Sequence, residues 1–335
     1  MSKKGVVQFF CMSLFILTIF ASIIWYRRDL DDYLNQMAEL DETCRCRLRT
    51  IQRIVNGRVQ PHTYMPWSVS ITRSGYHHHC MGTIVSPYFV LTAQHCLNTS
   101  KAAFEVRVGL YELFDPRLKE KSYRVQAVYK FPDFSNASFT GDLALLKLRK
   151  PIRFEPGHVE PACLDLENHR SGHGNSSSER TNQTLYVSAG FGTKQDVFFR
   201  NHKMVGKFVP SLVLKTAYFT EDLADSDPNF GPLQDMFFNL MPVNKGSTEN
   251  PCMGDSGAGL NLENKETGLT TVKGVASISV PIQVNETTIQ FCKSNLIYTR
   301  LSYAHYREFI QSVLGDLRCR VELIEPKRRT PGDGD

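Results

Sequence analysis

The chain lacks a concentrated block of charge of one sign, although it carries a net charge of +5 over 335 residues. Its lysine and arginine residues are spread along the sequence, so the pattern gives no support to a nucleic acid as partner, and we expect none. An internal repeat is also missing, which excludes a repeat architecture. With 41% hydrophobic and 22% charged residues, the composition is that of a globular protein with a substantial core.

Charge is absent as well from residues 5–26, a run long enough to span a bilayer and longer than the apolar core usual in a cleavable signal peptide. Small residues at the paired cleavage positions are missing near its end, where the sequence reads IIWY, and this favours an uncleaved signal anchor. Two lysines lie in residues 1–4, whereas the arginines after the run are followed at once by aspartates. This asymmetry predicts a cytoplasmic tail of residues 1–4, with the remainder luminal or extracellular. Cleavage of the segment would instead give a secreted protein.

Two further features indicate passage through the secretory route. Five Asn-x-Ser/Thr acceptor sequences predict several N-linked sugars, and they begin at Asn98, Asn136, Asn175, Asn182 and Asn285. Of the nine cysteines, only Cys11 lies inside the apolar run. The remainder is an even number, which suits a set of disulfides formed in an oxidising compartment.

The composition and the hydrophobic pattern of the sequence change at residue 54. Residues 27–53 are charged and have no sustained apolar period, which is typical of a stalk or propeptide. Beyond them, short runs rich in Val, Ile, Leu, Tyr and Phe alternate with Gly, Pro and Asn turns; examples are residues 67–71, 83–92 and 143–148. This alternation predicts an all-β domain over residues 54–315.

Three other segments complete the organisation. Residues 167–184 are rich in Ser, Asn, His and Gly and contain two sugar acceptors, which predicts an exposed inserted loop. The apolar period of residues 303–314 predicts a helix at the end of the domain. Residues 316–335 are charged and then rich in Gly and Pro, so we expect a flexible tail.

Residues 252–259, CMGDSGAG, form the stretch with the clearest chemical content. A turn of small residues can expose the hydroxyl of Ser256 beside free backbone N–H donors, which makes a nucleophile with an oxyanion hole. Upstream, LTAQHC supplies His95 and GDLALL supplies Asp142, each in a strand-like segment. Taken singly, these are a buried histidine, a turn aspartate and a surface serine; their combination predicts nucleophilic catalysis with His95 as base.

These three motifs, in the order His, Asp, Ser, resemble the trypsin/chymotrypsin family of serine endopeptidases. The resemblance implies two antiparallel β-barrels with the active site in the cleft between them. It implies that Asp142 orients His95 and that the N–H groups of Gly254 and Ser256 bind the oxyanion. We expect no cofactor and no metal. The implied partners are a protein or peptide substrate, an activating protease and a protein inhibitor.

The string RIVNG at residues 53–57 resembles the activation site of such a zymogen. A cut between Arg53 and Ile54 would free an α-amino group on an apolar residue. By the resemblance, Asp255 is its partner, and formation of this buried pair would lock the Gly254 turn into its oxyanion-binding shape. A simple strand entry is the alternative interpretation of the same string.

The resemblance also implies a disulfide framework, with Cys80 bound to Cys96 and Cys252 bound to Cys292. Cys163 matches the position that bridges to a propeptide, where both Cys44 and Cys46 lie, and the one left over would have Cys319 as partner. These pairings stay open because sequence alone does not settle connectivity. Two further family bridges are missing, and Tyr186 and Leu262 stand at the positions of one of them.

The substrate pocket is where the sequence departs most from the family. Asn250 falls at the pocket base, where trypsins carry an aspartate, so cleavage after Arg or Lys is not expected. Ser277, Ile278 and Ser279 replace the usual Ser-Trp-Gly wall, and Leu296 replaces a glycine that keeps the pocket open. A narrowed pocket motivates a rival hypothesis from another class, an inactive homologue that acts as an extracellular binding or decoy module.

The run of three histidines at residues 77–79 raises the question of a metal site. Adjacent residues of a strand point to opposite faces and cannot converge on one ion. We therefore expect a strand at the solvent edge, near the leaving-group side of the cleft.

Overall fold

The computed structural model of the chain divides it into two compact units, residues 1–44 and residues 45–335. The parts that the structure describes are residues 45–47, 65–73, 78–98, 103–113, 121–166, 184–192, 198–200, 203–205, 211–221, 235–243, 252–263, 270–279, 282–285, 288–290, 295–315 and 320–322, with six helical positions at 18, 19, 22–24 and 27. Among these residues, no helix has the length and apolar character that crossing a membrane requires. Most of the anchor segment 5–26 lies outside the described residues, and the anchor stays a prediction.

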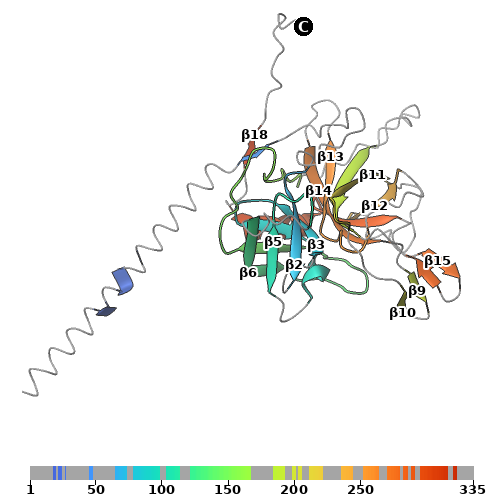
Figure 1. The fold of residues 1–335 in the computed structure, drawn as a ribbon, viewed down its shortest axis with the longest axis horizontal. Coiled ribbons are helices and arrows are strands. Elements are labelled where there is room, and N and C mark those ends of the chain that lie inside the picture. The colour runs from blue at the N-terminus through green and yellow to red at the C-terminus, as the bar shows by residue number, and fades with distance from the viewer. Residues whose placement is uncertain are drawn as a thin grey trace, which may run out of the picture. The chain divides into compact units, whose positions relative to one another are not determined.

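The first half of the second unit forms a closed antiparallel barrel in the strand order β2-β3-β4-β7-β6-β5, drawn in blue to green in Figure 1. Its strands are β2 (Ser68–Arg73), β3 (His78–Ile84), β4 (Phe89–Thr92), β5 (Phe104–Arg107), β6 (Ser122–Lys130) and β7 (Ala144–Leu148). β4 and β7 are almost wholly buried, which explains their continuous apolar runs, whereas β6 has an outer face of exposed residues.

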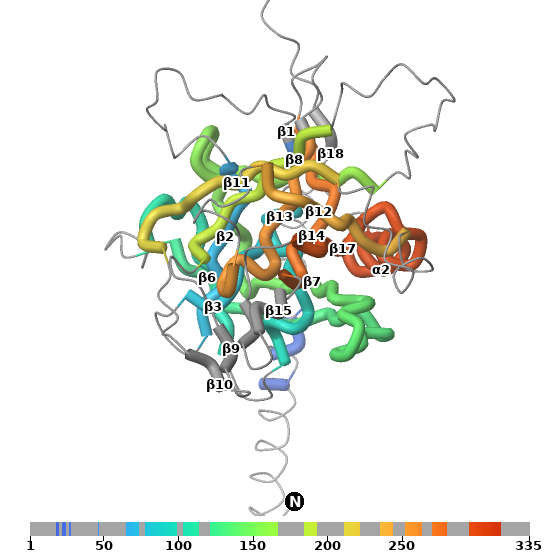
Figure 2. Tube along the Cα trace, turned by 90° about the vertical axis from the view of Figure 1, so that its right-hand side faces the viewer, coloured from blue at the N-terminus to red at the C-terminus, as the bar shows by residue number. Residues whose placement is uncertain are grey.

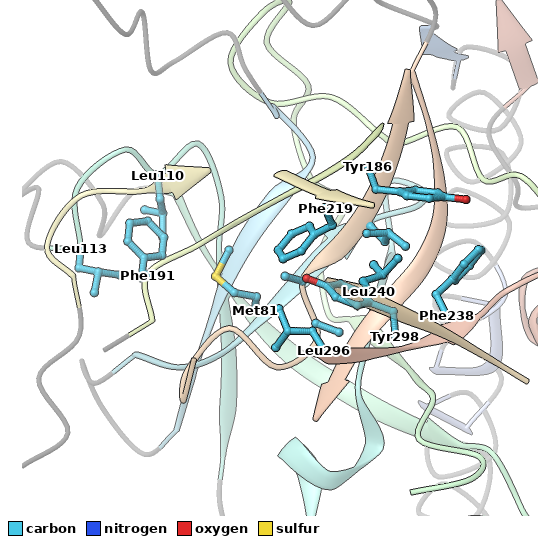
Figure 3. Close-up of a cluster of buried hydrophobic side chains, with 13 residues drawn as sticks. Met81, Leu110, Leu113, Tyr186, Phe191, Phe219, Phe238, Leu240, Leu296 and Tyr298 are labelled. Carbon is cyan, nitrogen blue, oxygen red and sulfur yellow. The ribbon is translucent and has the colours of Figure 1, made fainter. Parts of the chain in front are cut away.

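The second half forms another closed antiparallel barrel, in the order β11-β12-β17-β14-β13-β8. Its strands are β8 (Leu185–Gly190), β11 (Lys215–Glu221), β12 (Phe237–Pro242), β13 (Gly259–Glu263), β14 (Thr270–Ser279) and β17 (Leu296–Arg300). The expected all-β fold with two antiparallel barrels is therefore confirmed. Figure 3 shows part of the core of this barrel, in which Tyr298 and Leu296 of β17 lie beside Leu240 of β12.

Two smaller sheets accompany the barrels. A four-stranded antiparallel sheet has the order β10-β9-β16-β15, with β9 (Phe198–Arg200), β10 (Lys203–Val205), β15 (Ile282–Asn285) and β16 (Thr288–Gln290). The short strands β1 (Arg45–Arg47) and β18 (Arg320–Glu322) pair in parallel, so the segment before the barrels meets the chain that follows them.

Helices are few in the described part of the second unit. The 3₁₀ helix η2 (Gln94–Leu97) follows β4. The α-helix α2 (Ala304–Leu314) follows β17, as Figure 2 shows. The buried side chains of α2 are Tyr306, Ile310 and Leu314, which recur every four residues and form the apolar stripe that packs on the domain. The helix begins one residue later than predicted, at Ala304.

One predicted strand is wrong in its extent. The apolar residues 83–92 do not form a single strand, because the chain turns over residues 85–88 between β3 and β4. Phe89 N–H donates to Ser86 O, and Ser86 Oγ accepts from Tyr88 N–H, which closes this turn. The turn residues are themselves buried, and this explains why the apolar pattern does not show the break.

A buried hydrogen bond joins the two barrels, and its two residues are 194 positions apart in the sequence. Trp67 Nε1, just before β2, donates to Asn261 Oδ1 of β13 at 3.0 Å. Asn261 Nδ2 in turn donates to the backbone oxygens of Val187 and Gly259. Because both side chains are almost fully buried and fully paired, this contact holds the two barrels against each other.

Candidate active site

His95 and Asp142 are brought together at the edge of the first barrel. His95 lies on η2 and Asp142 precedes β7. His95 Nδ1 lies 2.7 Å from Asp142 Oδ2, and the backbone N–H of His95 donates to Asp142 Oδ1 at 2.8 Å. An ionised carboxylate only accepts hydrogen bonds, so Nδ1 carries the ring proton and the lone pair of Nε2 is left to act as a base.

The position of Asp142 is over-determined by groups from the second half of the chain. Its carboxylate is fully buried and accepts a third bond, from Ser277 Oγ, at 2.5 Å. The hydroxyl of Tyr306 on α2 accepts the N–H of Gly141 at 2.8 Å, which holds the residue before Asp142. Together with His95 on η2, contacts from β14 and α2 therefore fix the carboxylate that orients His95.

Ser256 lies on a tight turn that joins residue 252 to β13. Asp255 N–H donates to Cys252 O, Ala258 N–H donates to Asp255 O, and Met81 N–H of the first barrel donates to Ser256 O. Gly257 has a φ of +88°, and a Cβ there would lie 2.2 Å from Met81 O. Only glycine fits this close approach, which seats the turn against the first barrel.

Two residues of this turn that line the cavity, Gly254 and Ser256, have backbone N–H groups that are not used inside the described part of the chain. Among the described residues, neither Gly254 N–H nor Ser256 N–H has a hydrogen-bond acceptor, although Gly254 O accepts a bond from His78 Nε2 at 2.9 Å. Two such N–H groups beside a hydroxyl are suited to hold a developing negative oxygen. Within the same described part of the chain, no hydrogen bond joins Ser256 Oγ to His95 Nε2, but both residues line one cavity.

Asp255 is buried in a cradle of backbone donors. Gly192 N–H donates to Oδ1 at 2.6 Å and Cys252 N–H donates to Oδ2 at 2.8 Å. A Cβ at Gly190 or at Gly192 would lie within 2 Å of a carboxylate oxygen, so both positions require glycine. Burial raises the pKa of Asp255 to about 7, against the opposing effect of the backbone bonds from Cys252, Gly192 and Phe191.

His78 is buried behind the Ser256 turn, and this corrects the expected solvent-edge strand. β3 lies between β2 and β4 in the closed barrel and is not an edge. Since the carbonyl of Gly254 can only accept, His78 Nε2 donates to it, and Nδ1 accepts from Ser70 Oγ at 2.8 Å. Burial lowers the pKa of His78 to about 4, with smaller effects from the Gly254 bond and from His79, so the ring is neutral.

A cavity of about 500 Å³ opens between the barrels, and both contribute to its lining. The first barrel supplies His79, His95 and Phe139, and the second supplies the Ser256 turn together with Ser277, Ile278, Ser279 and Leu296. Leu296 is buried and packs in the hydrophobic core of the second barrel while it faces the cavity. The wall residues predicted for the pocket thus lie together in one site.

Phe139 was not predicted as a site residue. Its ring meets the His95 ring edge to face, with 5.8 Å between centroids. Its φ of +55° is the single positive value at a non-glycine residue in the described part of the chain. Such a backbone is costly for an aromatic residue, and no sequence pattern signals it.

The structure pairs Cys80 with Cys96 and Cys46 with Cys163, and Cys252 is also disulfide-bonded. The sulfurs of Cys80 and Cys96 lie near a ring nitrogen of His95, but both are used in their bridge and are not metal ligands. Several predicted residues lie outside the described part of the chain: Cys44, Arg53, Ile54, Asn175, Asn182, Asn250, Cys292 and Cys319. The signal anchor and the activation cut therefore stay predictions from the sequence.

Comparisons with known proteins identify the family and the fold. Residues 54–294 match the family model described as Trypsin. Ovochymase of Halocynthia roretzi is 32% identical over 118 residues, which are 35% of this chain and 7% of that protein's length. Human heparin binding protein superposes with a TM-score of 0.56 at 20% identity, over 78% of this chain and 96% of its own. A mutant of that protein gives the same TM-score at 21% identity, and at these identities the likeness shows the fold.

Proposed function

The chain belongs to the trypsin family, and we propose that it is a serine endopeptidase in which His95, Asp142 and Ser256 carry catalysis. The observation that carries the proposal is the pair of hydrogen bonds from His95 to a fully buried carboxylate, at the edge of the cavity that Ser256 also lines. His95 takes the Ser256 proton through Nε2 as the hydroxyl attacks a peptide carbonyl, and later gives it to the leaving amine. Asp142 stabilises the imidazolium formed between these steps.

The developing oxyanion would accept from the N–H groups of Gly254 and Ser256. Removal of one such donor typically costs about 10² to 10³ in rate. No metal or cofactor enters this scheme, because the base, the nucleophile and the donors are all groups of the chain.

We propose that a separate protease activates the chain by cutting between Arg53 and Ile54. The raised pKa of Asp255 supports a role for this carboxyl, because a buried acid without a charged partner is held protonated. A new α-amino group at Ile54 would supply that partner and favour the ionised form. Since Cys46 is bonded to Cys163, the segment before the cut would stay covalently attached to the catalytic unit.

Specificity for Arg or Lys is not part of the proposal. The cavity wall of Ser277, Ile278 and Leu296 is largely apolar, which favours an uncharged side chain before the scissile bond. The natural substrate would be a protein or peptide outside the cytoplasm, and a protein inhibitor of the same cleft is an expected partner.

We further propose a single-pass membrane protein with residues 5–26 as signal anchor and the peptidase domain on the luminal or extracellular side. The absence of charge from this segment supports the anchor, and the disulfides support an oxidising compartment. Sugars on the acceptor asparagines belong to the same hypothesis. A cleaved segment would give the secreted form.

A second candidate is a binding or decoy module without peptidase activity. It is favoured by Leu296, which fills space at the cavity wall, and by the lack of a hydrogen bond between Ser256 and His95. The experiment that separates the two candidates is labelling of the purified chain with a fluorophosphonate probe, before and after a cut at Arg53. Labelling that needs the cut and is lost in Ser256→Ala supports the peptidase. A folded, cut chain that takes up no probe would establish the binding module.

A further inference from the structure

Two of the five sugar-acceptor asparagines lie against each other on the surface. Asn98 is the residue that ends η2, and Asn136 lies in the loop between β6 and β7. Asn98 Nδ2 donates to Asn136 Oδ1 at 3.2 Å, and both residues are exposed. Each begins its own Asn-x-Ser/Thr sequence, so the side-chain amides of two acceptors from separate segments are in contact.

The elements that present these asparagines are the ones that carry the cleft. η2 holds His95, and the loop of Asn136 holds Phe139, whose ring contacts the His95 ring at 5.8 Å. The loop is closed on itself, because Phe139 N–H donates to Ser135 O at 2.8 Å and Ser135 N–H donates to Thr140 O at 2.9 Å. One short, well-braced loop therefore places Asn136 at the surface and Phe139 in the lining of the cavity.

We propose that Asn98 and Asn136 form one N-glycan site at the rim of the cleft, which admits slender polypeptide segments and excludes bulky folded proteins. N-linked sugars are large and hydrated. Asn98 comes three residues after His95 and Asn136 three residues before Phe139, and His95 and Phe139 both line the cavity, so a sugar at this point is attached close to that side of the opening. Because Asn98 and Asn136 are in contact, a sugar on either one alone would cover the same side of the cleft opening. The selection of flexible over folded substrates rests on the proposed function, because it requires that the chain is a peptidase.

The modification itself needs a lipid-diphosphate-linked oligosaccharide as donor. The Asn amide nitrogen loses one proton and bonds to the anomeric carbon of the donor sugar, while the bond from that carbon to the lipid diphosphate breaks. The lipid diphosphate leaves, and the proton goes to the base of the transferring enzyme. The hydroxyl residues that complete the two acceptor sequences are Ser100 and Ser138.

The first test measures occupancy. The full chain is produced in glycosylating cells, and peptides that contain Asn98 and Asn136 are analysed by mass spectrometry after enzymatic sugar release in heavy-oxygen water. We expect at least one of the two asparagines to carry a sugar in most molecules. A population with neither asparagine modified overturns the proposal.

The second test measures access and does not need catalysis. In a Ser256→Cys chain, the rates of thiol alkylation are compared for a small maleimide and for a maleimide on a long polyethylene glycol. The ratio of the bulky to the small rate should rise severalfold when Asn98→Gln and Asn136→Gln are combined, and also when a peptide N-glycosidase treats the folded chain. Asn285→Gln, which removes a different acceptor, is the matched control and should leave the ratio unchanged.

An unchanged ratio in the double variant, with occupancy demonstrated, overturns the gating role. Because alkylation reports only on access, this outcome is independent of fluorophosphonate labelling. A chain that resists the fluorophosphonate but shows the ratio change would reject the proposed peptidase and retain the rim site.

Discussion

The two barrels have cores of different character. The first is filled mainly by aliphatic side chains such as Ile71, Ile84, Leu91, Leu145 and Leu148, all essentially without exposure. The core of the second contains an aromatic group in which Tyr186 meets Phe238 at 5.5 Å and Phe219 meets Tyr298 at 6.0 Å. The first barrel carries His95 and Asp142, whereas the second carries Ser256 and most of the pocket wall.

Departures from the family pattern are concentrated in the second barrel. Tyr186 and Leu262, which stand where a family disulfide is expected, face each other across β8 and β13. Arg300 stacks over the Phe238 ring at 3.7 Å and pairs with Glu221 at 2.8 Å, which adds polar bracing at the end of β17. The second barrel also contains the Gly-Asp-Ser-Gly residues of the Ser256 turn, so its departures from the family pattern lie in the pocket wall and in the missing disulfide.

The largest effect is expected from the first barrel, in Asp142→Asn. An amide in place of the carboxylate allows the wrong tautomer of His95, so kcat of the cut chain should fall about 10⁴-fold with a small change in KM. Steady-state kinetics on a peptide that the wild type cleaves measures it. Ser277→Ala removes one bond to the same carboxylate and is the control, with an expected loss of roughly 10- to 100-fold. A loss below tenfold in Asp142→Asn would contradict the assigned role.

One buried titratable group in each barrel should change the folding stability with pH, and the two changes should have opposite signs. In the uncut chain the pKa of Asp255 is raised to about 7 by burial, so between about pH 4 and 7 the folded state holds a proton that the unfolded state has lost. Its contribution makes stability fall as pH rises. The pKa of His78 is lowered to about 4 by burial, so over about pH 4 to 6.5 the unfolded state binds the extra proton and stability rises with pH.

Urea unfolding at several pH values in this range gives the free energy of unfolding of the wild type and of the Asp255→Asn and His78→Gln chains. The difference between the wild type and each variant measures the contribution of that group. At about 1.4 kcal/mol per pKa unit, each corresponds to a few kcal/mol over the full window. After a cut at Arg53 the Asp255 contribution should shrink or reverse, because an α-amino partner favours the carboxylate. Slopes of the same sign for both variants would contradict the comparison.

The smallest effect is expected in the second barrel, from Leu296→Ala. Loss of this buried side chain should lower the free energy of unfolding by about 3 kcal/mol. It should also enlarge the pocket, so that a peptide-library screen shows faster cleavage after larger residues. Leu240→Ala is the matched control, because Leu240 pairs with Leu296 across β12 and β17 and is buried in the same core but does not line the cavity. Equal changes of preference in both variants would contradict a direct role for Leu296 at the pocket wall.

The alternation of apolar runs and turns predicted an all-β domain, whereas the two barrels and the closeness of His95 to Asp142 were implied by the resemblance of short motifs to the family. Alternation of side chains marks the strands, and the spacing of Gly, Asp and Ser marks the turn. The sequence did not predict the burial of His78 or the contact of Phe139 with His95. The first depends on a strand's place within a closed barrel, and the second depends on an unusual φ, neither of which leaves a local trace. The pairing of Cys163 with Cys46 likewise needed the fold.

The bond from Gly141 N–H to the Tyr306 hydroxyl has a consequence for biosynthesis. The two residues are 165 positions apart, and Tyr306 lies on α2, after every strand of both barrels. At typical translation speeds of about 5 to 20 residues per second, the first barrel waits roughly ten to thirty seconds for this partner. The turn that holds Asp142 is thus completed only when synthesis of the whole domain has finished. A chain released early would form the first barrel without the hydrogen bond that holds the residue before Asp142.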